Sequence, residues 1–256
     1  MRLIINADDL GYSEGVNAEI FDLASRNLLT SATLITNAPF FDRAIERLGN
    51  FPRCSFGIHL NLTEFRPLTS SPGLQPLLNP SGEFDGDAIR SITLTPLIRH
   101  AIFQEWSAQV TRLIAAGHVP SHLDSHHHVH TIPPLLPILK RVQRRFVIRR
   151  VRITKNIYGP DQPVSKSLLL RKRVWNFLLR HWYSTATTQG FTSFREFYDL
   201  VAISGLDRWL RDDKSAVIEL MTHPGNPLFQ EETALLYSPW VGAGASTFQP
   251  ASYSDL

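Results

Sequence analysis

Residues 3–11 read Leu-Ile-Ile-Asn-Ala-Asp-Asp-Leu-Gly, a short apolar run that ends in two adjacent acids. A run of this length, bounded by polar residues, predicts a buried strand over Leu3–Ala7. Ser13 then has the place of a helix N-cap, and apolar residues recur behind it at helical spacing. The alternation continues with a strand over Ser31–Asn37, a helix over Phe40–Leu48 and a strand over Ser55–Leu62. A βαβαβ order of this kind predicts a parallel sheet with helices packed against it.

The rest of the chain continues this alternation less regularly. Its pattern predicts helices over Leu97–Ala116, Leu135–Phe146, Ser165–Tyr183 and Leu200–Trp209, and strands over His122–His130, Val147–Thr154, Phe191–Phe197 and Ala216–Thr222. Residues 63–96 are rich in proline and are interpreted as a long loop over the C-terminal mouth, and residues 226–256 as an irregular tail. A length of 256 residues is usual for a (β/α)₈ barrel. We therefore expect one α/β domain over residues 1–256, a deformed TIM-like barrel with seven strands.

The composition is that of an ordinary globular protein, with 43% hydrophobic and 19% charged residues. The formal charge of +3 is too small to indicate nucleic-acid binding. A single cysteine, Cys54, excludes an intramolecular disulfide and fits a reducing compartment. No apolar run has the length of a signal peptide core or of a transmembrane segment. These features predict a cytoplasmic protein.

Unusual polar residues follow the predicted strands at their carboxyl ends. Asp8 and Asp9 follow the first strand, His59 and Asn61 lie late in the third, and His223 follows the last. Because the carboxyl ends of the strands in a parallel barrel share one mouth, we expect these side chains to converge there. Two adjacent buried carboxylates repel each other, and a divalent cation is the simplest compensation. The alternative is an Asx-type turn in which Asp9 caps the next helix.

Residues 122–130 read His-Leu-Asp-Ser-His-His-His-Val-His and hold five of the ten histidines of the chain. Neutral imidazole is a common metal ligand, and a neighbouring carboxylate such as that of Asp124 can orient it. The alternative for this segment is an exposed polar strand end. For His59 the alternative is a hydrogen-bonded core residue, and for His223 it is a turn residue without a chemical role. If the segment is a strand, one face would carry His122, Asp124, His126, His128 and His130, and His127 would point the other way.

Four motifs in this order resemble those of one known family. They are Asn-Ala-Asp-Asp-Leu-Gly at residues 6–11, Gly-Ile-His-Leu-Asn-Leu-Thr at 57–63, His-Leu-Asp-Ser-His-His-His at 122–128 and Leu-Met-Thr-His-Pro-Gly at 220–225. The chain resembles the YdjC-like carbohydrate deacetylases, which include the chitooligosaccharide and hopanoid-associated deacetylases. The motifs span most of the chain, although residues 158–213 add little to the resemblance.

The resemblance implies a deformed β/α barrel that removes the N-acetyl group from an amino sugar. By the same resemblance, Asp9, His59 and His126 hold one divalent metal ion, while Asp8 is the general base and His223 the general acid. Such a donor set suits zinc, but a carboxylate and waters also admit magnesium, so the expected cofactor is Mg²⁺ or Zn²⁺. We consider Asn61, Asp124, His128 and Arg152 as further residues that contact substrate or support the ligands.

Other interpretations remain open on the sequence alone. A metal-dependent phosphoesterase on a β/α barrel would often use two metal ions, and His128 and His130 could supply part of a second site. A non-catalytic carbohydrate-binding barrel is the other alternative.

The roles of some residues also remain open. Arg152 can bind a substrate oxygen or pair with an acid, and Phe65 and Phe84 in the long loop can form a platform for a sugar. The apolar and basic helix over residues 165–183 can pack inside the fold, face a membrane or form a homodimer.

Overall fold

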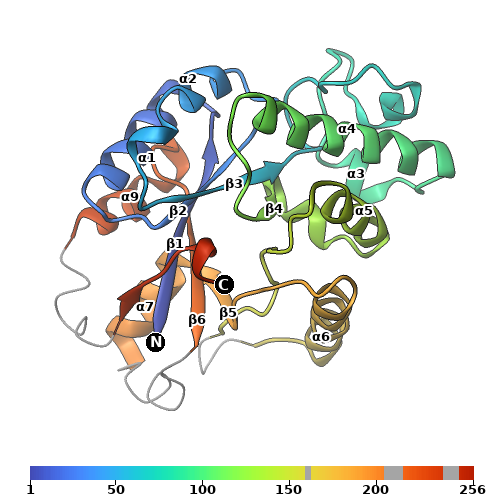
Figure 1. The fold of residues 1–256 in the computed structure, drawn as a ribbon. Helices are drawn as coiled ribbons and strands as arrows, with labels where there is room; N and C mark the ends of the chain where they lie inside the picture. Colours follow the sequence, from blue (N-terminus) through green and yellow to red (C-terminus); the bar gives the residue numbers. More distant parts are fainter. Residues whose placement is uncertain (159–162, 205–215, 239–247) are drawn as a thin grey trace.

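The computed structural model describes residues 1–158, 163–204, 216–238 and 248–256. Its centre is a curled parallel sheet in which β1 lies between β2 and β6 (Figure 1). The strand order is β4-β3-β2-β1-β6-β5, and a two-residue strand, β7, pairs with the beginning of β1. The bounds of the strands are β1 Arg2–Leu10, β2 Ser31–Leu34, β3 Ser55–Leu60, β4 Leu123–Ser125, β5 Gly190–Ser193, β6 Val217–Thr222 and β7 Gln249–Pro250.

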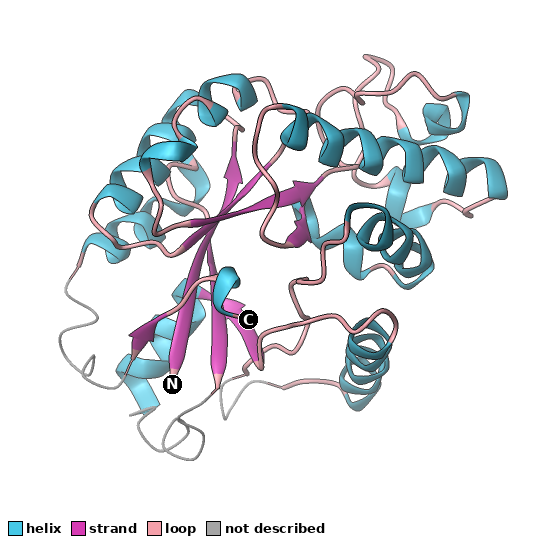
Figure 2. Cartoon of the chain, viewed as in Figure 1, coloured by secondary structure: helices cyan, strands magenta, loops and turns pink. Residues whose placement is uncertain are grey.

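Helices lie on the outside of the curled sheet, so the structure has the α/β, barrel-like architecture expected from the sequence (Figure 2). Longer helices follow most strands, and their apolar faces form one large core with the sheet. Their bounds are α1 Glu14–Ser25, α2 Phe41–Ile45, α3 Ala88–Ser91, α4 Pro96–Ala115, α5 Leu136–Phe146, α6 Lys166–His181, α7 Phe194–Ser204 and α9 Gln230–Tyr237. No helix among the described residues has both the length and the apolarity needed to span a bilayer.

The predicted helix at residues 165–183 is confirmed as α6, and the helix predicted at residues 97–116 is confirmed as α4. Of the helix predicted over Leu200–Trp209, residues 205–209 lie outside the described residues. The described part belongs to α7, which begins earlier, at Phe194. The residues from Phe194 onward were predicted to be strand, but β5 ends at Ser193.

The strand predicted over Val147–Thr154 is wrong as a regular strand. This segment instead makes isolated parallel bridges, from Val151 to Leu123 of β4 and from Arg150 to Ala186, and just beyond it Asn156 bridges to Phe191 of β5. The chain thus spans the gap between the two edge strands of the sheet without a continuous ladder. Val147 itself has a left-handed backbone with φ of 57°, which ends α5 rather than beginning a strand.

Two regions predicted to be irregular contain ordered elements. Within residues 63–96 lie a 3₁₀ segment at Pro72–Leu77, helix α3, and an antiparallel bridge between Leu78 and Phe84. Phe84 is buried there, which is incompatible with a sugar platform on that ring. The prediction of an irregular tail after Gly225 is also wrong, because α9 lies there and Tyr253 near the end of the sequence is buried beside the sheet.

Candidate metal centre

The backbone at the end of β1 brings two consecutive carboxylates to the same mouth. In a regular strand Asp8 and Asp9 would point to opposite faces. Here the pairing of β1 with β2 changes register between Ala7 and Leu10, and Asp9 has a left-handed φ of 69°. The bulge turns the Asp9 side chain toward β3 while Asp8 still points into the curled sheet. A left-handed conformation at a non-glycine residue is strained, and such strain is concentrated at functional sites.

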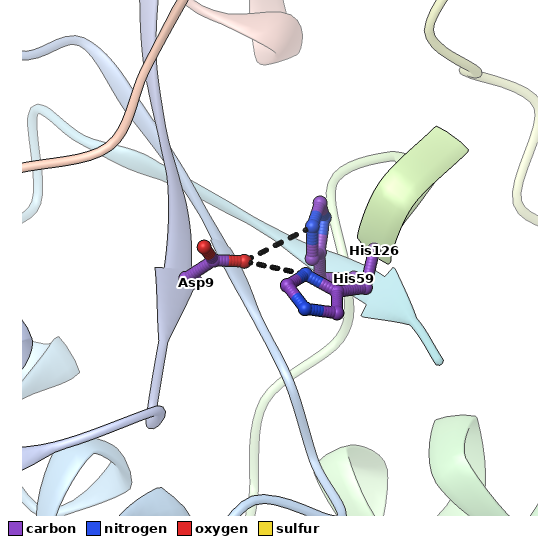
Figure 3. Close-up of side chains that lie close together, drawn as sticks. All are labelled: Asp9, His59 and His126. Carbon is purple, nitrogen blue, oxygen red and sulfur yellow. Dashed lines mark ion pairs between the residues drawn. The ribbon is translucent and has the colours of Figure 1, made fainter. Parts of the chain in front are cut away.

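Three buried side chains from distant parts of the chain meet at this point (Figure 3). Asp9 comes from β1, His59 from β3, and His126 from the residue that follows β4. Oδ1 of Asp9 lies 2.8 Å from Nδ1 of His126 and 3.3 Å from Nε2 of His59. One ligand atom from each residue lies within 4.8 Å of the others, so the three can hold one metal ion.

The donor set of this cluster fits a divalent cation. Oδ1 of Asp9 and Nε2 of His126 are buried, and beyond the ion-pair contacts of Asp9 with the two imidazoles and of His126 with Glu64 neither atom makes a hydrogen bond. Such unsatisfied polar atoms are costly in a protein interior unless a ligand compensates them. Burial alone would raise the pKa of Asp9, but His126 and His59 outweigh it and hold that pKa well below its usual range. Asp9 is therefore an ionised carboxylate, which is the form that a metal ion requires.

Asp124 orients one of the two imidazoles. Its Oδ1 lies 2.6 Å from Nδ1 of His59, and Thr33 donates a hydrogen bond of 3.1 Å to its other oxygen. The Nε2 atom of His59 is left to face Asp9, and it lies 3.9 Å from Oδ2 of Asp8. A carboxylate behind the histidine is the arrangement that fixes the ring in known metal sites. Burial lowers the pKa of His59, but Asp124 and Asp8 overcome this and raise it to about 10, so the ring would have to release the proton on Nε2 for that atom to bind a cation.

Asp8 is held by a buried arginine. Arg152 donates two hydrogen bonds to it, of 2.7 and 2.6 Å, and Asn6 donates a third of 2.8 Å. Burial would raise the pKa of Asp8, but Arg152 and His59 hold it well below its usual range. Arg152 also contacts Asp124 at 2.9 Å and Glu219 at 2.8 Å. Of the two sequence interpretations of Arg152, the structure therefore shows the pairing with acids.

His223 lies just beyond β6 and outside the cluster of three. Its ring stacks on that of Phe229 with 4.4 Å between centroids, and its backbone N–H donates to Oε1 of Glu232 at 2.7 Å. Nδ1 of the ring is buried without a hydrogen-bond partner. Burial lowers the pKa of His223, but Glu232 and the charge of Asp8 raise it above its ordinary value. A pocket of about 410 Å³ borders His223, Ser193, Arg195, Met221 and Phe229.

The prediction of a long histidine strand is wrong. After β4 the chain enters a 3₁₀ segment, His126–Thr131, in which His127 and His128 have left-handed φ values of 50° and 56°. His126 and His128 therefore do not share a strand face. The ring of His128 meets Phe191 edge-on at 5.7 Å, and Nδ1 of His130 lies 2.5 Å from Oγ of Ser125. Neither belongs to a metal-competent group among the described residues, so the second site proposed for them has no support there.

Asn61 is buried and supports the turn that carries Glu64. Its side chain accepts hydrogen bonds from the backbone and hydroxyl of Thr63 and donates one of 2.7 Å to the carbonyl of Glu64. Glu64 then lies 3.5 Å from Nε2 of His126 and 3.8 Å from Nε2 of His127. Asn61 thus acts through this turn, at a distance from the three candidate ligands.

Sequence reasoning missed Glu64, Glu219 and Tyr253. Glu219 is the single acid within the apolar strand β6, and an acid at such a position is a recognisable signal. Its partner, the hydroxyl of Tyr253, donates a short hydrogen bond to Oε2 of Glu219, while the Tyr253 ring stacks on His122 at 3.4 Å. A side chain at Gly57 would overlap the His122 ring, so glycine is required there. Nothing in the local sequence around Tyr253 indicates these contacts.

Comparisons with known proteins agree with this fold. A family model described as YdjC-like protein matches residues 2–243. A carbohydrate deacetylase of Brevibacillus brevis is 34% identical over 88% of this chain and 81% of its own length. One of Halalkalibacterium halodurans is 37% identical, but that match spans only 57% of this chain and 61% of the relative. A solved structure from Enterococcus faecalis V583, named for cellobiose-phosphate cleavage, covers 99% of this chain and 98% of its own with a TM-score of 0.78 and 23% identity. That likeness shows the fold alone.

Proposed function

The chain belongs to the YdjC-like protein family, and from this premise we propose that it is a metal-dependent hydrolase that removes the N-acetyl group from an amino sugar. The relatives named carbohydrate deacetylases support the reaction and the class of substrate. The observation that carries the proposal is the meeting of the buried side chains of Asp9, His59 and His126, whose candidate ligand atoms lie within 4.8 Å of one another.

Asp9, His59 and His126 would hold the metal ion, with Asp124 fixing the ring of His59 through Nδ1. A divalent ion bound there would polarise the acetyl carbonyl and lower the pKa of a coordinated water. The donor set admits Zn²⁺ and Mg²⁺ alike, because imidazole suits the first and carboxylate oxygen and water suit the second.

Asp8 would accept the proton of the attacking water. The low pKa that Arg152 imposes keeps this carboxylate ionised over the whole neutral range, so it never needs to be deprotonated first. Arg152 also fixes both oxygens of Asp8 in one orientation through its paired hydrogen bonds. Asp8 would in this way be a weak base that is held in place, and proximity rather than basicity would make it effective.

His223 would donate a proton to the sugar nitrogen as the amide bond breaks. An amine leaves far more easily than an amide anion, so this step needs an acid. The raised pKa of His223 favours its protonated form near neutral pH, and Glu232 supports that charge. The ring also borders the pocket next to β6.

The test measures acetate released from N-acetylglucosamine oligosaccharides, together with bound metal per chain. Asp8→Asn should lower the rate by about 10²- to 10⁴-fold, because it removes the proton acceptor, and should leave the metal bound. Asp9→Ala, His59→Ala and His126→Ala should each lose the metal and, with it, acetate release. His100→Ala, an exposed histidine on α4, is the matched control and should retain both.

Unchanged metal content in all three ligand variants would contradict the assignment of the ligands. Two metal equivalents per chain, with phosphate released from a phosphate ester and no acetate from any acetylated sugar, would favour the phosphoesterase instead. Sugar binding without turnover in the metal-loaded protein would identify a carbohydrate-binding barrel.

A further inference from the structure

Helix α6 has apolar residues on two opposite sides. Its inner side packs on the fold through Trp175 and Leu179, which are buried. On the outer side Leu170, Val174 and Phe177 are 63%, 51% and 59% exposed. Their spacing of four and three residues places these three in one stripe along the helix. A helix that needed only to cover the sheet would carry polar residues on that side.

The surroundings of this outer stripe are strongly cationic. Residues 140–180 contain 13 of the 26 lysines and arginines of the chain, of which Lys140 and Arg152 are buried in the fold, but only one of its 23 acids, Asp161. On α6 itself Lys166, Arg171 and Arg173 are exposed. Beyond the end of the helix, Arg144 and Arg149 lie over the ring of Tyr183, at 5.8 and 5.6 Å from its centroid. None of these five cations takes part in an ion pair within the parts of the chain that the structure describes.

A pocket of about 400 Å³ lies along one flank of α6, against residues 154–158. Leu169 and Phe177 contribute apolar walls. No acid borders it among the described residues, and its charged lining residues are Lys155, Lys172, Arg173 and Arg180. The ammonium group of Lys172 already contacts the Tyr158 hydroxyl at 2.7 Å, which leaves the pocket with hydroxyl and cationic donors side by side. This combination suits a phosphate group attached to an apolar chain.

We propose that α6 docks the protein on the anionic surface of a lipid bilayer. The stripe of Leu170, Val174 and Phe177 enters the boundary between head groups and acyl chains, and the cations around it bind lipid phosphates. The flank pocket receives one head group. The proposal rests on α6 and the cations and pocket beside it, and it stands whether or not the deacetylase reaction is correct.

A second copy of the chain fits this surface less well than a bilayer does. A symmetric dimer through α6 would bring Arg171 and Arg173 of both copies together without any acid on the helix to balance them. Like charges facing each other across an interface are costly. An anionic bilayer instead supplies the opposite charge together with an apolar layer, which matches both features of the helix.

The experiment measures co-sedimentation of the full chain with vesicles of phosphatidylcholine mixed with phosphatidylglycerol, and with vesicles of phosphatidylcholine alone. We expect binding to the mixed vesicles only, and its loss at high salt. The double variant Leu170→Glu with Phe177→Glu should bind at least about tenfold more weakly, because the stripe no longer enters the apolar layer. Arg171→Glu with Arg173→Glu should weaken binding by a similar factor.

The matched control is Leu97→Glu with Val119→Glu, two apolar residues that are 59% and 77% exposed elsewhere on the surface. This variant should bind like the parent chain, and circular dichroism should show all variants folded. Absence of binding to the mixed vesicles would overturn the proposal, as would equal binding to phosphatidylcholine alone. A concentration-dependent dimer that Leu170→Glu with Phe177→Glu abolishes, without vesicle binding, would assign the stripe to a second copy.

Discussion

Arg152 and Lys140 are both buried cations, but their surroundings differ completely. Three carboxylates, those of Asp8, Asp124 and Glu219, surround the guanidinium of Arg152. The ammonium group of Lys140 donates instead to two neutral acceptors, the carbonyl of Leu179 at 2.6 Å and the hydroxyl of Thr185 at 2.7 Å. Burial lowers the pKa of both, but the carboxylates reverse this for Arg152, while the pKa of Lys140 falls to about 7.

The difference shows what each buried charge does in the molecule. The charge of Arg152 is permanent, and it fixes the orientation of Asp8 and Asp124 on either side of His59. Lys140 joins α5 to α6, and its charge there depends on pH, because neutral acceptors compensate a buried ammonium group only in part. The buried cation of the candidate site therefore faces opposite charges, whereas the buried ammonium group in the layer of helices outside it faces only neutral acceptors.

The largest effect that tests this contrast is expected from Arg152→Met. The variant leaves three buried carboxylates without their cation, and it should lower the free energy of unfolding by about 3–5 kcal/mol. Denaturant unfolding measures this. Arg150→Met, two residues earlier, removes an arginine that binds backbone carbonyls near the surface, and it should cost less than about 1 kcal/mol. Equal losses in the two variants would show that the carboxylates do not depend on Arg152.

A smaller effect is expected from Tyr253→Phe, which removes the hydroxyl donor to Glu219. A hydrogen bond to a charged group typically contributes about 1.5–3 kcal/mol, so the free energy of unfolding should fall within that range. Tyr237→Phe is the matched control, because its hydroxyl lies within hydrogen-bond distance of two acids, Glu19 and Asp22, at the surface. That variant should change stability by no more than about 0.5 kcal/mol. Equal losses of stability in Tyr253→Phe and Tyr237→Phe would show that the Tyr253 hydroxyl does not stabilise the cluster around Arg152.

The effect that is smallest when taken per pH unit concerns Lys140. The pKa of Lys140 is about 7 in the folded protein, against 10.5 for an ordinary lysine side chain. Between these pH values the unfolded chain holds a proton that the folded chain has released, so stability rises with pH, and the penalty is complete below pH 7. The rise is at most about 1.4 kcal/mol per pH unit. Denaturant unfolding at several pH values measures this rise. The rise should be absent in Lys140→Met and present in Lys155→Met, which replaces an exposed lysine. Parallel stability curves for both variants would contradict the assignment.

The sequence allowed the order of the first strands and helices to be predicted, because apolar runs and caps are local signals. It also predicted that Asp9, His59 and His126 come together, since parallel strands end at one edge of a sheet. Their role as ligands stays a prediction. The contact between Asp124 and His59 could be anticipated for the same geometric reason, as their strands β3 and β4 pair directly with these two residues opposite each other.

Other features could not be read from the sequence for equally physical reasons. Left-handed backbone at Asp9, His127 and His128 has no local signal, because none of these residues is glycine. Strand alternation therefore gave the wrong directions for the side chains that follow β4. Tyr253 reaches Glu219 across 34 residues of sequence, and that contact depends on the packing of the whole sheet.

The central position of β1 has a consequence for how the molecule is assembled. Arg2 pairs with Val217 of β6 on one side and with Gln249 of β7 on the other, so the beginning of the first strand waits on both sides for partners that lie more than 200 residues further along the chain. At a synthesis rate of about 5–20 residues per second, this wait lasts on the order of ten seconds or more. During that time the nascent strand exposes a free edge together with Asp8 and Asp9. Refolding from denaturant should also be slow, because β1 must find strands that are far away in the sequence. A chaperone that shields free strand edges should increase the yield of refolding.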